Sequence, residues 1–397
     1  MSTSTAEPVR ASTWPGVGTD EVVSPPPGHP RFPLLDSLRA LAAVGVLLAH
    51  VAIFSGQAQR LGWGAGLANL FTGVTVFFVL SGFLLFRPFF NSEMSAAPSP
   101  RMRDFARRRF LRIVPAYWLA LTILAVYPGV PGVFTSHWWR YYGFVQFYFP
   151  RSTSTQGLGI AWTLCVEVAF YAMLPVYVAV TRRVTRTYTP AHRVRFHLFL
   201  LAVLAVASIA VRIPFQSAVM QNSLPAHFLW FAIGMALAVL SVAYQDERLL
   251  PRAMKLVTAR PGWCWVSAGV VYLIMCVILT SAPGHLFYSA SQAFWQYTLS
   301  GLVAALIVMP AVFGQRQGGT PRRILSLRWL AWLGIISYGI YLWHATIAIT
   351  LVAHGVRSWW LLLITDLALA TTVAAGSYYL LERPILRLKR RGSARAV

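Results

Sequence analysis

An arginine and a histidine in one apolar segment have side chains suited to catalysis. Arg39 and His50 stand in LDSLRALAAVGVLLAHV, eleven residues apart. That spacing is just over three helical turns, so both lie on one face of the predicted helix, about 16 Å apart along its axis. A buried neutral imidazole can act as a general base, and a guanidinium can hold an anion in a fork geometry. A snorkelling arginine and a satisfied core histidine are the alternative, and the shared face favours the functional pair.

Arginines also cluster before a later apolar segment, in RMRDFARRRFLRIVPAYW. Arg109 and Arg112 are three residues apart and therefore lie on one helix face. Together with Arg39 they predict a cytoplasmic socket for a ligand that carries several phosphates. Ordinary positive charge on the cytoplasmic side of a membrane helix is the alternative interpretation.

Two other apolar segments carry polar groups at membrane depth. Glu167 stands in AWTLCVEVAFY, and a carboxylate at such depth usually needs a partner. We expect Glu167 to pair with His50 and fix its tautomer, and a structural bridge to Arg212 is the alternative. Ser81, in GVTVFFVLSGFLLF, is a candidate for the ligand socket, and close packing of small residues explains Ser81 and Gly82 equally well.

Three further polar groups lie in the last two apolar segments. His344, in LGIISYGIYLWH, reaches about the depth of His50. It either contacts an acceptor or lies at the membrane interface beside Trp343. We interpret Asp366 as a solitary helix-packing group. Glu382 ends the last helix and contributes charge balance in the basic socket.

The composition of the chain indicates a membrane protein. The chain has 397 residues, of which 57% are hydrophobic and 11% charged, with a mean hydropathy of +0.59. Soluble proteins carry about a quarter charged residues, so a soluble domain, a disordered chain and a disulfide scaffold are excluded. A membrane helix needs about 20 apolar residues. This window predicts ten spans, at 33–56, 66–86, 113–128, 158–180, 196–213, 225–243, 262–280, 294–313, 329–353 and 358–382, the third extended by the amphipathic segment before it.

Basic residues give the orientation of these spans. Of the 34 Lys and Arg residues, 28 lie in the two tails and one set of connectors, and four lie in the opposite connectors. Because basic residues favour the cytoplasmic side, the sequence predicts an all-α membrane protein, a bundle of about ten transmembrane helices with both termini in the cytoplasm. The same rule explains the net charge of +23 without a nucleic-acid partner.

The chain divides into a membrane domain with two tails. We expect residues 1–31 to form a disordered cytoplasmic tail, because they contain a proline run and no apolar stretch that would suit a signal peptide. Residues 32–388 form the ten-span domain, and residues 389–397 form a basic cytoplasmic tail. The aromatic segment 129–157 is predicted to be an interfacial or re-entrant loop. The cysteines show no metal-ligand spacing, so we expect inert core thiols and no metal.

The polar motifs, in this order and on these spans, resemble the acyltransferase-3 family of integral-membrane O-acyltransferases. The resemblance covers residues 32–388, with Ser37 where such proteins often have glycine. The segments that carry it are LDSLRALAAVGVLLAH, FFVLSGFLL, RRFLRIVPAYW, WTLCVEVAFY, ISYGIYLWH and LERP.

The resemblance implies transfer of an acyl group, commonly acetyl, from cytoplasmic acyl-CoA to a hydroxyl. It also implies that the protein lies in the cell (inner or plasma) membrane. Its acceptors are surface polysaccharides, lipopolysaccharide, peptidoglycan, glycolipids or macrolides. It assigns the essential histidine to His50, as general base or as transient acyl carrier, with Glu167 as the second catalytic candidate. Acyl-CoA is then a co-substrate, with no permanently bound cofactor, at a site formed by Arg39, Ser81, Arg109 and Arg112. We expect no appended extracytoplasmic domain of the SGNH type.

The length of the predicted helix between Arg39 and His50 supports the same chemistry. The pantetheine arm of CoA has a reach comparable to the rise of about 16 Å between Arg39 and His50. Arginines at the cytoplasmic opening can therefore hold the phosphates while the acyl group is delivered near His50. A polytopic secondary transporter that uses the same buried polar groups is the main alternative, and a membrane scaffold without a site is the other. Transporters often show paired halves, whereas the polar positions here cluster in the first four spans, which favours the enzyme.

Overall fold

Helices account for the regular structure of the part of the chain that the computed structural model describes, residues 34–59, 63–95, 98–149, 156–213, 217–244, 251–279, 289–313 and 319–386. No strand occurs in these ranges, which confirms the predicted all-α class. The helices are α1 (Leu34–Phe54), α2 (Trp63–Ala68), α3 (Thr72–Met94), α4 (Met102–Val126), α5 (Trp138–Tyr142), α7 (Trp162–Val184), α8 (Pro190–Arg212), α9 (Ala218–Gln221), α10 (Phe228–Ala243), α11 (Arg252–Ala259), α12 (Pro261–Leu279), α13 (Ala290–Val312), α14 (Thr320–Leu325), α15 (Arg328–Ala353) and α16 (Trp359–Ser377). A π-helical turn, Tyr378–Glu382, continues α16.

Ten helical segments of the described ranges are long and apolar enough to cross a membrane. They coincide with the ten predicted spans, so the chain is a multi-pass membrane protein. The largest difference in length is at α4, where the short predicted span at 113–128 becomes a helix of 25 residues. Its first turns are the arginine-rich segment, which continues the helix as predicted and carries Arg109 and Arg112 on one face.

The two predicted tails, residues 1–31 and 389–397, lie outside the described ranges. Segment 129–157 contains the short helix α5 and further turns in its described part, and it has no span, in agreement with the predicted loop. Tyr117 of α4 donates a hydrogen bond of 2.9 Å to the Tyr141 carbonyl oxygen, which ties this loop to the bundle.

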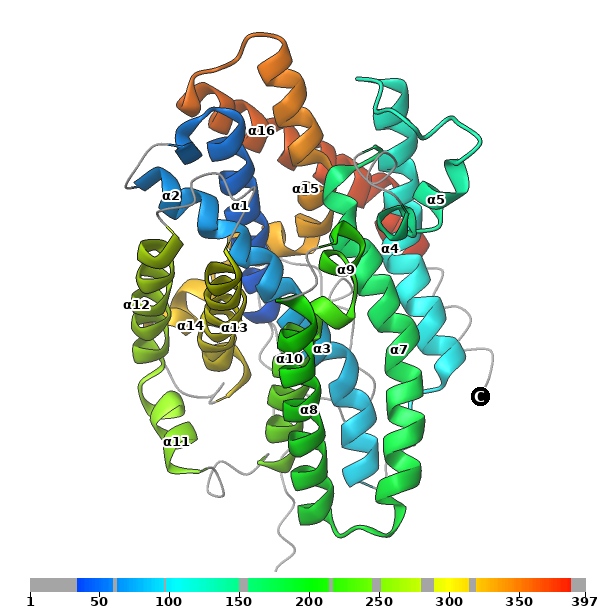
Figure 1. The fold of residues 1–397 in the computed structure, drawn as a ribbon, viewed down its shortest axis with the longest axis vertical. Coiled ribbons are helices and arrows are strands. Elements are labelled where there is room, and N and C mark those ends of the chain that lie inside the picture. Colours follow the sequence, from blue (N-terminus) through cyan, green and yellow to red (C-terminus); the bar gives the residue numbers. More distant parts are fainter. Residues whose placement is uncertain are drawn as a thin grey trace, which may run out of the picture. The chain divides into compact units, whose positions relative to one another are not determined.

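Glycines let α1 pack closely against two other helices. A Cβ atom on Gly334 of α15 would lie 1.9 Å from the Asp36 carbonyl oxygen, and one on Gly73 of α3 would lie 2.4 Å from the Ala42 carbonyl oxygen. Real Cβ atoms do not approach so closely, so only glycine permits these contacts. Further along α3, a Cβ on Gly82 would lie 2.3 Å from the Phe231 carbonyl oxygen of α10. The helix α3 thus passes from the side of α1 to the side of α10 (Figure 1).

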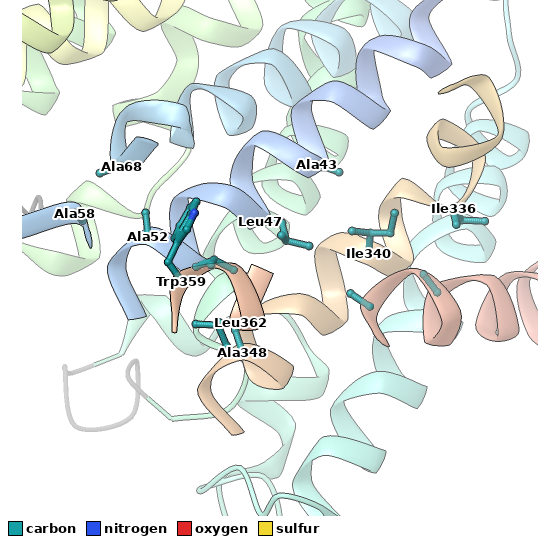
Figure 2. Packing of buried hydrophobic residues seen from close by; sticks show 13 residues of the cluster. Ala43, Leu47, Ala52, Ala58, Ala68, Ile336, Ile340, Ala348, Trp359 and Leu362 are labelled. Atoms are coloured by element: carbon teal, nitrogen blue, oxygen red, sulfur yellow. The ribbon is translucent and has the colours of Figure 1, made fainter. Parts of the chain in front are cut away.

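An apolar core joins α1 to the last two helices. Leu47 of α1, Ile340 of α15 and Leu362 of α16 are each at most 1% exposed and belong to one cluster of buried residues. Figure 2 shows these side chains gathered between the three helices, with Trp359 at the start of α16 closing the cluster. Close packing of this kind leaves few voids and fixes the rotation of each helix. The core therefore determines which polar residues of α1 and α15 meet.

Candidate active site

Glu167 accepts hydrogen bonds from side chains on two helices. Ser81 Oγ of α3 and Tyr171 Oη of α7 both donate to Glu167 Oε1, each over 2.6 Å. The two short bonds fix the orientation of the carboxylate. Ser81 therefore has a polar contact of its own, while the neighbouring Gly82 provides the close packing against α10. Close packing thus accounts for Gly82, and the ligand-binding role of Ser81 stays a prediction.

The predicted arginines lie around this carboxylate. Arg39 of α1 is close enough to Glu167 and to Arg112 of α4 for their charges to act on it. Arg109 of α4 lies over the Tyr171 ring, with its Cζ atom 5.9 Å from the ring centroid. Four helices thus contribute to one group of side chains, which we call the arginine site. Its members are Arg39, Ser81, Arg109, Arg112 and Glu167.

The arginine site has unused capacity for an anion. Arg109 Nε is buried and has no hydrogen-bond partner in the described part of the chain. Arg39 Nη1 lies 4.0 Å from Asp36 Oδ1, a partly exposed pair that contributes little to stability. Glu382, 4% exposed at the end of the last helix, interacts with the charges of Arg112 and Arg39 and balances part of the positive charge.

His50 lies away from the arginine site, close to the end of α1. Its Nδ1 is 3.0 Å from the Val46 carbonyl oxygen. Its ring packs against Phe71, edge to face with centroids 4.7 Å apart, and against Phe54 at 5.6 Å. No residue of the described ranges forms a hydrogen bond with His50 Nε2. The imidazole is thus held on one side and has a free nitrogen on the other.

A second histidine is the hydrogen-bond partner of His50. His344 Nε2 of α15 lies 3.1 Å from His50 Nδ1, and the ring centroids are 4.9 Å apart. His344 Nδ1 lies 3.0 Å from the Ile340 carbonyl oxygen. The side chain is fully buried, at 0% exposed. The predicted proximity of His344 to the depth of His50 agrees with this contact, and its position relative to the membrane interface stays a prediction.

The predicted contact between Glu167 and His50 is also wrong. The hydrogen bonds of Glu167 come from Ser81 and Tyr171, whereas those of His50 involve Val46 and His344. The alternative bridge from Glu167 to Arg212 is wrong as well.

Arg212 instead lies at the end of α8, with Nη1 3.3 Å from His227 Nε2 and its Cζ atom 4.7 Å from the centroid of the Tyr297 ring. Spacing along one helix gives the face that a residue occupies, but the rotation of neighbouring helices decides which faces meet.

Tyrosines near both groups were not predicted as site residues. Tyr341 Oη lies 2.8 Å from Thr163 Oγ1, and the Tyr341 ring packs 5.8 Å from that of His344. Tyr171 lies one helical turn after Glu167. The sequence does carry a signal for both, because spacings of three and four residues place each tyrosine on the same helix face as its polar neighbour.

An apolar cavity of about 330 Å³ lies elsewhere, among α1, α3, α12 and α13. Leu41, Gly45, Val76 and Trp265 are among the residues that line it, and none of the predicted site residues does. The cavity therefore belongs neither to the arginine site nor to the histidine pair. Those two groups are connected through α1, which carries Arg39 in its second turn and His50 near its other end.

The membrane bundle thus carries Arg39 of the arginine site and His50 on one helix, as the motifs predict. The chain belongs to the acyltransferase-3 family, because the model of its acyltransferase domain matches residues 32–382. This confirms the family to which the motifs pointed.

Individual relatives are identical to the chain at about a quarter of the aligned residues. Peptidoglycan O-acetyltransferase OatA of Listeria monocytogenes is 27% identical over 327 residues, which are 79% of this chain and 48% of the relative. YrhL of Bacillus subtilis is 25% identical over 382 residues, 90% of this chain and 55% of the relative. Nodulation protein 10 of Rhizobium leguminosarum is 26% identical over 377 residues, 89% of this chain and 93% of the relative. The chain thus spans about half the length of the first two. No solved structure matches it significantly.

Proposed function

We propose that this protein is an O-acyltransferase that moves an acyl group, in the first instance acetyl, from cytoplasmic acyl-CoA to a hydroxyl of an extracytoplasmic glycan, glycolipid or macrolide-type acceptor. The names of the relatives, which include a peptidoglycan O-acetyltransferase, support the reaction class. The observation that carries the proposal is the position of Arg39 and His50 on α1, one in a group of three arginines and the other paired with His344.

The arginine site is the donor end of this arrangement. The phosphates of CoA need several cationic hydrogen-bond donors, which Arg39, Arg109 and Arg112 supply. Glu167 holds this end in place, because Ser81 and Tyr171 fix it and its charge acts on Arg39. In this proposal Glu167 is a positioning residue and not a catalytic one.

His50 is the acceptor end. The thioester travels along α1 over about 16 Å, which the pantetheine arm spans. His50 takes the proton of the acceptor hydroxyl, and the oxygen attacks the thioester carbonyl carbon. The carbon–oxygen bond forms as the carbon–sulfur bond breaks, and the thiolate of CoA receives the proton that His50 removed. The products are the acyl ester and free CoA, and the balance needs no further reactant.

The orientation of the bundle belongs to the same proposal. Both termini lie in the cytoplasm, so that Arg39 faces the compartment in which acyl-CoA is made and His50 lies toward the opposite side. The positions of the basic connectors support this orientation. The protein then lies in the inner or plasma membrane, and the lipid bilayer surrounds it.

The test uses the full-length protein reconstituted in liposomes with labelled acetyl-CoA as donor and an extract of surface glycans and glycolipids from a deletion strain as acceptor. His50→Ala is expected to lose acetyl transfer, by about 100-fold or more, because it removes the base. His354→Ala is the matched control, since His354 lies exposed at the end of α15, with its Nδ1 2.8 Å from the Thr350 carbonyl oxygen of the same helix. Full activity of His50→Ala in correctly inserted protein would disprove the proposal.

The acceptor is identified in cells. Mass spectrometry of surface glycans, glycolipids and secreted metabolites is compared between a deletion strain and the same strain complemented with the wild-type chain. The proposal expects one class to lose an acyl mass on deletion and to regain it with the wild type but not with His50→Ala. An unchanged profile in all three strains contradicts it.

A further inference from the structure

The contacts of the histidine pair, His50 and His344, indicate which ring nitrogen of His50 carries a hydrogen. In a neutral imidazole one ring nitrogen carries a hydrogen and the other has a lone pair, and the hydrogen bond made by one fixes the state of the other. Both histidines have Nδ1 3.0 Å from a carbonyl oxygen of their own helix, Val46 for His50 and Ile340 for His344. A carbonyl oxygen only accepts, so each Nδ1 carries the hydrogen.

The contact between the rings agrees with this assignment. Because His344 Nδ1–H donates to Ile340, His344 Nε2 has the lone pair and accepts. It lies 3.1 Å from His50 Nδ1, so the same N–H of His50 is shared between Val46 and His344. The opposite tautomer of His50 would bring its Nδ1 lone pair against two acceptors at once, which is repulsive. The single hydrogen on His50 Nδ1 is therefore shared by two acceptors, the Val46 carbonyl oxygen and His344 Nε2.

We infer that His344 is a positioning residue that holds His50 in the Nδ1–H tautomer, with Nε2 free as the base toward the acceptor hydroxyl. The inference rests on the proposed function and adds to it the residue that orients the base. When Nε2 takes the proton, the positive charge forms beside two acceptors already aimed at Nδ1–H, which stabilises the imidazolium. An aspartate has this role in serine hydrolases. Here a neutral imidazole has it.

The surroundings of His344 are suited to holding a fixed direction. Its side chain is fully buried, and the ring packs 5.8 Å from Tyr341, whose hydroxyl is anchored to Thr163 Oγ1 at 2.8 Å and the Ile160 carbonyl at 3.2 Å. The apolar core of α1, α15 and α16 packs next to it, through Ile340 and Ala348 one turn to either side. A residue so enclosed does not contact the substrate that receives the acyl group. Its effect on the reaction passes through His50.

Three variants of one position separate positioning from packing. His344→Gln offers an amide oxygen near the place of Nε2, whereas His344→Asn reaches only as far as Nδ1 and His344→Leu has no acceptor. We expect kcat to fall about 100-fold for Leu and Asn, as for loss of a well-oriented base, and Gln to recover at least a tenth of the wild-type rate. KM for acetyl-CoA should stay within about twofold, because the arginine site is untouched. Equal loss in all three variants, or a change confined to KM, overturns the inference.

A spectroscopic measurement keeps the inference testable even if these variants fold poorly. Nitrogen NMR of the wild-type protein with isotope-labelled histidine reports which ring nitrogen is protonated, and the His50 signals are assigned by subtracting the spectrum of His50→Asn. The Nδ1–H form is expected for His50. Protonation at Nε2 would overturn the inference, while inactivity of His50→Ala would still support the proposed function. Activity of His50→Ala would reject both.

Discussion

At the scale of single residues, the polar side chains of the bundle form two separate groups, the arginine site and the pair of His50 with His344. Arg39, Arg109 and Arg112 were grouped by sequence, and the structure brings them together. Glu167 was assigned to His50 and lies instead with Ser81 and the arginines. A partner within one helix follows from a periodicity of 3.6 residues, whereas a partner on another helix depends on packing that no local pattern records.

The arginine site gives a prediction for donor binding. Arg39→Lys keeps the charge but loses the planar fork that holds two phosphate oxygens. Loss of one charged hydrogen bond of about 1.5 kcal/mol corresponds to an increase of about tenfold in KM for acetyl-CoA. Steady-state kinetics measures this, with kcat expected to change little, because His50 is unaffected. Arg328→Lys, at the exposed start of α15, is the control and should leave both constants unchanged. A KM equal to that of the wild type would show that Arg39 does not hold the donor.

At the scale of elements, glycines set the distances between helices. The hydropathy of the sequence predicts the helices, and the residues SGF in the second span indicate close packing. That α10 is the helix packed against this position is seen only in the structure. An apolar helix face has no unique partner in a lipid bilayer, because lipid tails are as apolar as leucine. Shape at positions such as Gly82 and Gly334 then selects the neighbour.

Gly82 offers a direct test of this packing. In Gly82→Ala the new Cβ would lie 2.3 Å from the Phe231 carbonyl oxygen, which is backbone and cannot rotate away. The helices α3 and α10 must separate, and such overpacking costs about 1–3 kcal/mol. A lower midpoint of thermal unfolding in detergent is therefore expected. Gly269→Ala in α12 is the matched control, because a Cβ there meets nothing within 4 Å. Equal midpoints for both variants would contradict the close contact.

At the scale of the whole molecule, hydropathy predicts the number and the approximate positions of the membrane-spanning helices. Ten apolar runs correspond to ten helices, in the part of the chain that the structure describes, that are able to span a membrane, since backbone polar groups in lipid must be satisfied within each helix. The arrangement of those helices was not predictable in the same way. The pairing of His50 with His344 joins residues 294 positions apart and depends on the core of α1, α15 and α16.

The orientation of the bundle is the last property that can be tested directly. Ser136 lies exposed in the loop after α4, and Thr187 lies exposed between α7 and α8. With both termini in the cytoplasm, these two positions fall on opposite sides of the membrane. A membrane-impermeant maleimide should label Ser136→Cys in intact cells and Thr187→Cys only after permeabilisation. The native cysteines, Cys165, Cys264 and Cys276, are buried, so background labelling is low. The reverse pattern would place Arg39 outside and separate the arginine site from cytoplasmic acyl-CoA.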